Sequence, residues 1–199
     1  DDRERGFSFQ HSGPLDMRMN QTKGETAEEW LSMASEKQIM DVLKRYGEER
    51  FARRIARKII ETRAISPINT TGKLVEICQT SIPRKEKHKH PATRTFQAIR
   101  IQVNHELEEL EACLHDVIEL LNSGGRFVVI SFHSLEDRIV KRFFRRMEKG
   151  DDLPSRLPIR DAELNRRVKV IGKPVRASAA EVGRNRRARS SIMRIAEKL

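Results

Sequence analysis

An apolar run followed by an amphipathic segment is the clearest pattern in the chain. Residues 127–132 are almost all apolar, rich in β-branched and aromatic side chains, and directly follow the turn signal Gly124-Gly125. Such a run predicts a strand covered on both faces, as in a parallel α/β sheet. Residues 135–148 then alternate apolar and basic side chains at helical spacing. This pattern predicts an amphipathic helix after the strand.

The junction between this strand and this helix is the first candidate for chemistry. Ser134 is a good N-cap, and Asp137 three residues on nearly completes a capping box. In open α/β sheets, ligands bind where parallel strands end and helices begin. His133 and Ser134 therefore lie where a ligand is expected. The alternative is an ordinary strand–helix unit in which His133 is a polar loop residue.

Short helices are predicted before this unit. Capping boxes formed by Thr26 with Glu29 and by Ser35 with Gln38 predict two helix starts. A third helix is expected over 48–62, and a fourth begins at Thr70 or Thr71. Residues 1–24 lack helical periodicity and are predicted as an ordered loop, because their aromatic and methionine content argues against disorder.

The longest predicted helix covers residues 93–121. Its apolar side chains recur at alternating spacings of three and four without a break, and Gly124 and Gly125 follow its end. Further strands are expected at 168–171 and 192–196, with a short helix opened by Ser178 between them. All predicted strands thus lie after residue 125.

Charge indicates the kind of partner. Among 199 residues, 40 are Lys or Arg and 29 are Asp or Glu, which gives a net charge of +11 and a pI near 10.1. A surplus of this size favours a polyanion, most simply nucleic acid. Basic stripes occur at 50–58, 138–149 and 184–189. The alternative for each stripe is a solvated helix face.

The remaining chemistry is sparse. Cys78 and Cys113 lie among apolar helical positions and are interpreted as buried thiols in a reducing compartment. His88 and His90 lie in a basic loop without further ligands at suitable spacing, so we predict RNA contact there and no metal site. No signal peptide or membrane-spanning run is found, and a cytoplasmic protein without membrane contact is expected.

Several segments together resemble the MraW/RsmH family of S-adenosylmethionine-dependent methyltransferases. The segments are 6–9 (GFSF), 13–19 (GPLDMRM), 46–52 (YGEERFA), 90–98 (HPATRTFQA), 131–138 (SFHSLEDR) and 187–191 (RARSS). They stand in the family's order and cover essentially the whole chain. Asn20, where the family usually has Asp, and residues 183–186, where it usually has Asn-Pro, depart from the family pattern.

The resemblance implies an α/β fold with a helical insert domain, residues 1–90, followed by the C-terminal half of a Rossmann-like class I methyltransferase domain, residues 91–199. It implies N4-methylation of a cytidine in the decoding region of 16S rRNA, with rRNA or the small ribosomal subunit as partner. The family's cofactor-contacting motifs do not map onto this chain. The S-adenosyl-L-methionine site is therefore expected mainly upstream of Asp1.

The implied reaction assigns roles to residues. A cytosine amine is a poor nucleophile, so acceptors must hold it in line with the methyl group. The candidate catalytic and positioning residues are Ser131, His133, Ser134 and Asp137. The candidate RNA-binding residues are Arg50, Arg53, Arg54, Arg57, Arg94, Arg100, Asn104, Arg138, Arg142, Arg187 and Arg189. For every one of them a structural role is the alternative. For the chain as a whole, the alternative is a non-catalytic, basic RNA-binding protein, and a homodimer is possible.

Overall fold

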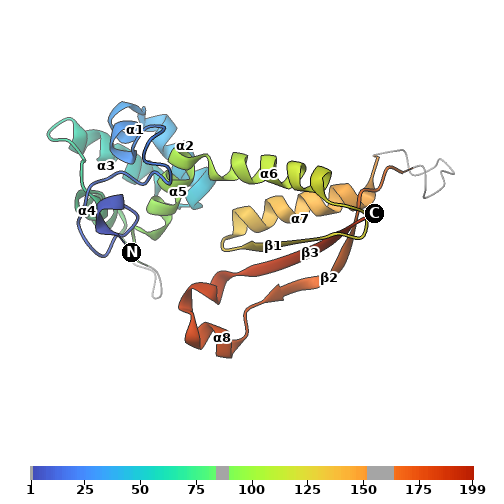
Figure 1. Ribbon diagram of the computed structural model, residues 1–199. Coiled ribbons are helices and arrows are strands. Elements are labelled where there is room, and N and C mark those ends of the chain that lie inside the picture. The colour runs from blue at the N-terminus through green and yellow to red at the C-terminus, as the bar shows by residue number, and fades with distance from the viewer. Residues whose placement is uncertain (1, 84–89, 152–163) are drawn as a thin grey trace. The chain divides into compact units, whose positions relative to one another are not determined.

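The structure is a computed structural model, which describes residues 2–83, 90–151 and 164–199 (Figure 1). The chain divides into two compact units, Asp1–Glu106 and Leu107–Leu199. The sequence placed a boundary after residue 90. Residues 91–106 instead belong with the helical unit, because the helix that they form packs there.

The first unit is helical. Its elements are η1 (Arg3–Arg5), α1 (Ala27–Met33), α2 (Glu36–Gly47), α3 (Ala52–Arg63), α4 (Thr71–Ser81) and α5 (Thr93–Asn104). Both predicted capping boxes are confirmed, at the starts of α1 and α2, and Thr70 caps α4. Helix α3 begins later than predicted. Glu48 takes a left-handed conformation, with φ 49°, at the end of α2, and this separates the two helices.

Helix α2 packs against both α3 and α5. The core of the unit contains fully buried aliphatic side chains from these helices, including Ile39, Leu43, Ile55, Ile59 and Ile99. The two positions in α2 and the two in α3 are each four residues apart, which places them on one side of their helix. Burial of this apolar stripe is what joins helices that are individually too short to be stable in water.

The loop before α1 is ordered by backbone pairing, as predicted for this segment. Leu15 N–H donates to Asn69 O at 3.1 Å, and Thr71 N–H donates to Gly13 O at 2.9 Å. Leu15 and Met17 are each 1% exposed. The loop thus contributes apolar side chains to the core although it has no helical periodicity.

The predicted helix over 93–121 is interrupted, which corrects that prediction. Helix α5 ends at Asn104, and α6 (Glu106–Leu120) begins after His105, which has φ 50°. The Asn104 side-chain amide donates to Arg100 O at 2.8 Å and to Met17 O at 2.8 Å. An Asn side chain that bonds to nearby backbone competes with helical hydrogen bonds. The apolar period continues through His105 and so hides the break.

The second unit combines most of α6 with a small sheet. Its other elements are β1 (Arg126–Ser131), α7 (Ser134–Lys149), β2 (Val168–Arg176), α8 (Ala179–Arg184), η3 (Arg186–Ser190) and β3 (Ile192–Lys198). Ser178 caps α8 as predicted. The strand order is β1-β3-β2, and both pairings are antiparallel. Within the described residues, the expected parallel pairing of the strand at 127–132 is therefore absent.

Helices α6 and α7 cover one face of this sheet. Leu114, Ile118, Val140 and Phe144 form a core cluster with Val168 of the edge strand β2 and Ala196 of the central strand β3. Phe127 and Val129 of β1 pack against this cluster.

The other face of β1 is open, which corrects the expectation of a doubly covered strand. Val128, Ile130 and Phe132 are 49%, 54% and 54% exposed. Strand β1 is also an edge strand, with β3 as its neighbour among the described residues. An apolar run usually marks a buried strand, but here the alternate side chains lack a covering layer within residues 2–83, 90–151 and 164–199.

The cysteines differ from each other. Cys78 is buried as predicted, and burial raises the pKa of its thiol to about 12. Cys113 is exposed, because it lies on the outward side of α6. The interpretation of Cys113 as a buried thiol was therefore wrong. Among the described helices, none has both the length and the apolar character required to span a bilayer.

Candidate functional site

The loop between β1 and α7 is organised by one histidine and one glutamate. His133, not Ser134, is the N-cap of α7, and Glu136, not Asp137, completes the capping box. Glu136 N–H donates to His133 Nδ1 at 3.4 Å, while Phe132 N–H and His133 N–H donate to Glu136 Oε2 at 2.7 and 3.1 Å. A capping box is thus present as predicted, but both of its residues lie one position earlier than expected.

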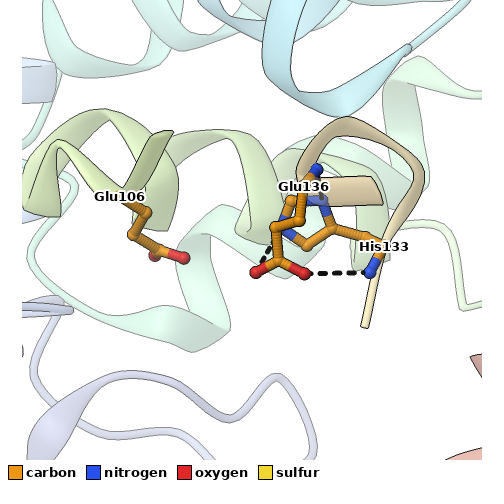
Figure 2. A group of neighbouring side chains, drawn as sticks. All are labelled: Glu106, His133 and Glu136. Carbon is orange, nitrogen blue, oxygen red and sulfur yellow. Dashed lines mark hydrogen bonds and ion pairs between the residues drawn. The ribbon is translucent and has the colours of Figure 1, made fainter. Parts of the chain in front are cut away.

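The His133 ring and the Glu136 carboxylate face each other (Figure 2). His133 Nε2 lies 3.2 Å from Glu136 Oε1, which is ion-pair distance, but Nε2 is buried and forms no hydrogen bond with the described residues. Because Nδ1 accepts a hydrogen bond, the neutral ring carries its proton on Nε2. Burial raises the pKa of Glu136, but the His133 side chain and the Phe132 and His133 N–H groups outweigh it, so the net pKa is lowered.

The other candidate catalytic residues have different surroundings. Ser131 is buried at the end of β1, whereas Ser134 is exposed in the first turn of α7. Asp137 accepts from Arg194 Nε at 2.7 Å and from Arg194 Nη2 at 3.0 Å. This bidentate pair joins α7 to β3, and both side chains are less than one-fifth exposed. Asp137 is therefore already engaged, and Ser134 is the candidate that is accessible.

The predicted basic face of α3 is present. Arg53, Arg54 and Arg57 are exposed on α3, and Arg50, which precedes the helix, is exposed as well. Arg57 Nε lies 3.4 Å from Glu61 Oε1, so part of the charge at the end of the helix is neutralised. Exposed arginines on one helix face are suitable for contact with phosphates.

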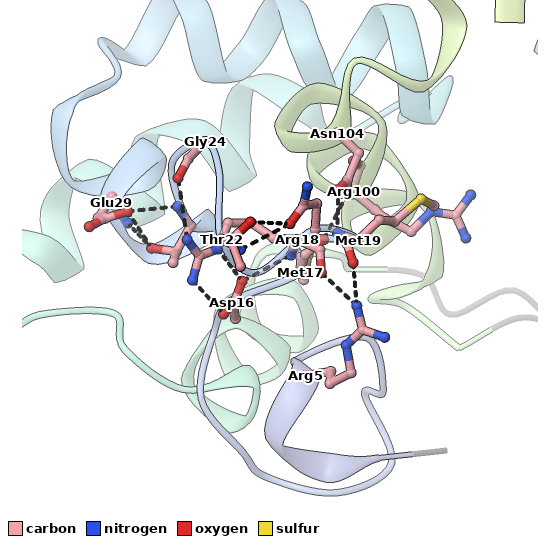
Figure 3. Close-up of polar contacts among 12 residues, drawn as sticks. Arg5, Asp16, Met17, Arg18, Met19, Thr22, Gly24, Glu29, Arg100 and Asn104 are labelled. Atoms are coloured by element: carbon pink, nitrogen blue, oxygen red, sulfur yellow. Dashed lines mark hydrogen bonds and ion pairs between the residues drawn. The ribbon is translucent and has the colours of Figure 1, made fainter. Parts of the chain in front are cut away.

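The α5 candidates take part in contacts within the first unit. Arg100 donates to both carboxylate oxygens of Glu106, at 2.7 and 2.9 Å. Asn104 accepts from Met19 N–H at 2.6 Å through Oδ1, in addition to its bonds to Met17 and Arg100 carbonyls (Figure 3). Arg94 is partly exposed and also has a partner. For Arg100 and Asn104 the contacts agree with the structural alternative, while RNA binding by them stays a prediction.

The second unit has two basic surfaces. Arg138 and Arg142 are exposed on α7, and Arg187 and Arg189 are exposed on η3. Arg142 lines a groove of about 220 Å³ between α6 and α7. The two surfaces are therefore accessible to a polyanion. Of the predicted basic loop, His90 is described, and its ring stacks on Phe9 with centroids 4.7 Å apart. Residues 84–89, including His88, lie outside the described residues.

A polar network in the loop before α1 was missed by sequence reasoning. Arg18 Nε and Nη2 donate to Asp16 at 2.8 and 3.0 Å, and Arg18 Nη1 donates to Gly24 O at 3.3 Å (Figure 3). The hydrogen bonds from Arg18 lower the pKa of Asp16 below its ordinary value of 3.8. The Asp-x-Arg spacing was the available signal, but it is too common in loops to identify such a network alone.

The strand–helix loop does not fit the cofactor implied by the resemblance. Its backbone N–H groups at Phe132, His133 and Glu136 already donate to side chains of the same loop. A nucleotide-like cofactor needs such groups free in the turn after a strand. Within the described residues we therefore assign no side chain to binding S-adenosyl-L-methionine.

The helical unit, the small sheet and the exposed arginines define a basic α/β protein with surfaces complementary to a polyanion. Residues 1–199 match the MraW methylase family, and the chain belongs to that family.

Named relatives agree with this assignment. The chain is 58% identical over 200 residues to the "Ribosomal RNA small subunit methyltransferase H" of Chromohalobacter salexigens. It is 55% identical over 197 residues to the protein of the same name from Thioalkalivibrio sulfidiphilus. These alignments cover 100% and 98% of this chain but 60% and 63% of the two relatives. The chain thus spans less than two thirds of their length.

Proposed function

We propose that this chain is the RNA-facing and C-terminal part of an S-adenosylmethionine-dependent rRNA methyltransferase that modifies N4 of a cytidine in the decoding region of 16S rRNA. The observation that carries the proposal is the family match over residues 1–199. Relatives named as small-subunit rRNA methyltransferases and the net charge of +11 support it. The substrate is 16S rRNA or the small ribosomal subunit.

The proposed division of labour follows the two units. The helical unit recognises RNA, and the second unit contributes the end of a Rossmann-like methyltransferase domain. Among the described residues, the open face and unpaired edge of β1 support this view, because Val128, Ile130 and Phe132, which directly follows the strand, form an apolar row of the kind that a continuing α/β sheet covers. In the longer protein, further strands and helices would extend the sheet there and hold the cofactor.

The chemistry proposed for this chain is orientation of the cytosine. The lone pair of the exocyclic amine is delocalised into the ring, so attack requires the amine to be held close to the methyl group and in line with it. S-adenosyl-L-methionine would supply that methyl group. Ser134, exposed at the start of α7, can accept a hydrogen bond from the amine. His133 and Glu136 fix the loop that presents Ser134, and Asp137 fixes α7 through Arg194.

The test is methyl transfer by the longer protein to small ribosomal subunits, with N4-methylcytidine measured in the digested RNA. His133→Asn is the sharpest variant, because Asn is a strong N-cap but has no imidazole. If His133 only caps α7, His133→Asn keeps the wild-type rate. If the imidazole contacts the substrate, the rate falls by more than about tenfold with unchanged thermal stability. Ser134→Ala is expected to lower the rate without unfolding the protein.

The competing function is a non-catalytic RNA-binding protein. The engaged amides of the β1–α7 loop favour it for this chain taken alone. Methylation at a different atom of the base would contradict the proposed reaction. RNA binding without methyl transfer by the longer protein would replace the proposed function with this alternative.

A further inference from the structure

A cleft in the first unit is lined by aromatic and polar residues that the site described above does not use. It has a volume of about 460 Å³. Its lining residues are Asp2, Arg5, Phe7, Ser8, Phe9 and Gln10. Two phenylalanines and one arginine in a strongly basic chain form the combination that commonly receives an unstacked nucleic-acid base.

The Phe9 ring is held by two other rings of the same unit. It is stacked on His90, with centroids 4.7 Å apart and planes 7° apart. It also meets Phe96 edge-on at 5.7 Å. Phe96 is 5% exposed and belongs to α5, so this contact anchors Phe9 to the helical core. An aromatic ring that is already immobilised loses little entropy when a ligand stacks on it.

Arg5 is fixed in a similar way but keeps a buried donor unused. Its Nη2 donates to Arg18 O at 3.0 Å and to Met19 O at 2.7 Å (Figure 3). Its guanidinium carbon lies 5.2 Å from the centroid of the Phe7 ring. Arg5 Nε is buried and has no acceptor in the described part of the chain. An acceptor atom that reached Nε would satisfy this donor, and every RNA base carries such atoms at its edge.

The backbone of the cleft is preformed. Gly6 lies between Arg5 and Phe7 with φ 72°, and an added Cβ would stand 2.6 Å from Pro14 O and 2.8 Å from Asp16 N. Met17 N–H also donates to Arg5 O at 3.0 Å. The segment around Gly6 is therefore packed directly against the loop at 14–17. Its shape does not depend on a ligand.

We infer that this cleft binds one unstacked base of single-stranded RNA, with the base stacked against Phe7 and Phe9 and hydrogen-bonded by Arg5. The inference rests on the proposed function, because it takes RNA as the partner. It adds a base-binding subsite to the phosphate contacts expected of the exposed arginines. A base in this subsite would fix the register of the strand, which phosphate contacts alone do not do.

The experiment compares two short single-stranded RNAs. One carries the fluorescent base 2-aminopurine at its centre, and the other has an abasic residue at the same place. Because both have the same phosphates, the ratio of their affinities isolates the contribution of one base. We expect the 199-residue chain to bind the base-bearing RNA about tenfold more tightly. We also expect quenching of the 2-aminopurine emission on binding, because the base stacks on an aromatic ring.

Phe7→Leu and Phe9→Leu keep an apolar side chain but remove the aromatic face. Each is expected to bring the affinity ratio close to one, whereas Phe7→Tyr retains it. Arg53→Ala on α3 is the matched control, since it should weaken both RNAs equally. Circular dichroism checks that each variant is folded. If Phe9→Leu does not fold, the result for Phe7→Leu alone tests the base-binding subsite.

The failures of the two proposals are distinguishable. A ratio near one for the wild-type chain, or a ratio that Phe7→Leu leaves unchanged, would overturn the subsite while RNA binding itself stands. Binding of neither RNA would contradict RNA recognition by this chain and the subsite together.

Discussion

Asp137 fits both a substrate-binding role and a structural role when it is judged from the sequence alone. Its position at the end of a strand and the start of a helix made it a candidate acceptor for the substrate. In the structure both of its oxygens accept from Arg194, and this pair ties α7 to β3. Arg194 lies far away in the sequence, so no local pattern could reveal it. The Asp137 carboxylate is thus already occupied by the structural contact with Arg194.

Asp137→Asn is expected to destabilise the protein by about 2 kcal/mol, because it weakens a charge-assisted bidentate contact in a largely buried place. Urea unfolding measures this loss. Glu197→Gln is the matched control, since it removes a carboxylate that pairs with Arg126, whose side chain is 67% exposed. The control should cost less than about 1 kcal/mol. Equal losses of unfolding free energy for both variants would show that the Asp137–Arg194 pair stabilises the protein no more than the exposed pair does.

Asp16 predicts a dependence of stability on pH. The Arg18 hydrogen bonds lower the pKa of Asp16 in the folded protein below its ordinary value of 3.8. The stabilisation is therefore fully present above pH 3.8 and is lost as pH falls through the lowered pKa. Urea unfolding from neutral to acidic pH should show a steeper loss for the wild type than for Asp16→Asn. Parallel curves in this acidic range would contradict the assignment.

At the scale of elements, the sequence predicts what depends on neighbours along the chain. The capping boxes of α1 and α2 are local, and both were placed correctly. The direction of pairing of β1 depends on β3, more than sixty residues later, and the apolar run at 127–132 carries no information about it. The break at His105 depends on the contact between Asn104 and a loop far away in sequence. The sequence could not reveal these contacts.

The same limit applies to the candidate site. His133 was placed correctly at the strand–helix junction, but its role as N-cap was assigned to Ser134. Histidine is an uncommon cap, so the residue preferences pointed one position too far. The arginines of α3 could be placed on the exposed face because their helical period is regular.

The break between α5 and α6 predicts a stabilising substitution. His105 has φ 50°, a conformation that glycine adopts more readily than other residues. His105→Gly is expected to stabilise the first unit by up to about 1 kcal/mol, as measured by thermal unfolding. His105→Val, with a β-branched side chain, should destabilise it by at least as much. A loss of stability in His105→Gly would indicate that the histidine side chain itself contributes.

For the whole molecule, contact with a polyanion depends more on where the positive charges lie than on the net charge. Exposed arginines lie on α3, α7 and η3, so both units have basic surfaces, which we propose as the surfaces that contact RNA. Phosphate contacts release counterions, which makes the affinity fall with salt concentration.

Replacing Arg53 and Arg54 by alanine is expected to reduce the slope of log affinity against log salt by about 0.7 per arginine for single-stranded RNA. Fluorescence anisotropy over a salt series measures this slope. Lys37→Ala, which removes an exposed charge from α2 outside the basic surfaces, should leave the slope nearly unchanged. An unchanged slope in the double variant would exclude α3 from the RNA contact.

The open face of β1 is also expected to affect whether copies of the chain associate with one another. An exposed edge strand with an apolar face is a template on which identical molecules can add as extra strands. The net charge of +11 opposes such growth, because like-charged molecules repel at low ionic strength. Salt screens this repulsion within roughly 10 Å at about 0.1 M. We therefore expect a salt concentration that would release RNA from the arginines also to weaken the repulsion that keeps copies of the chain apart.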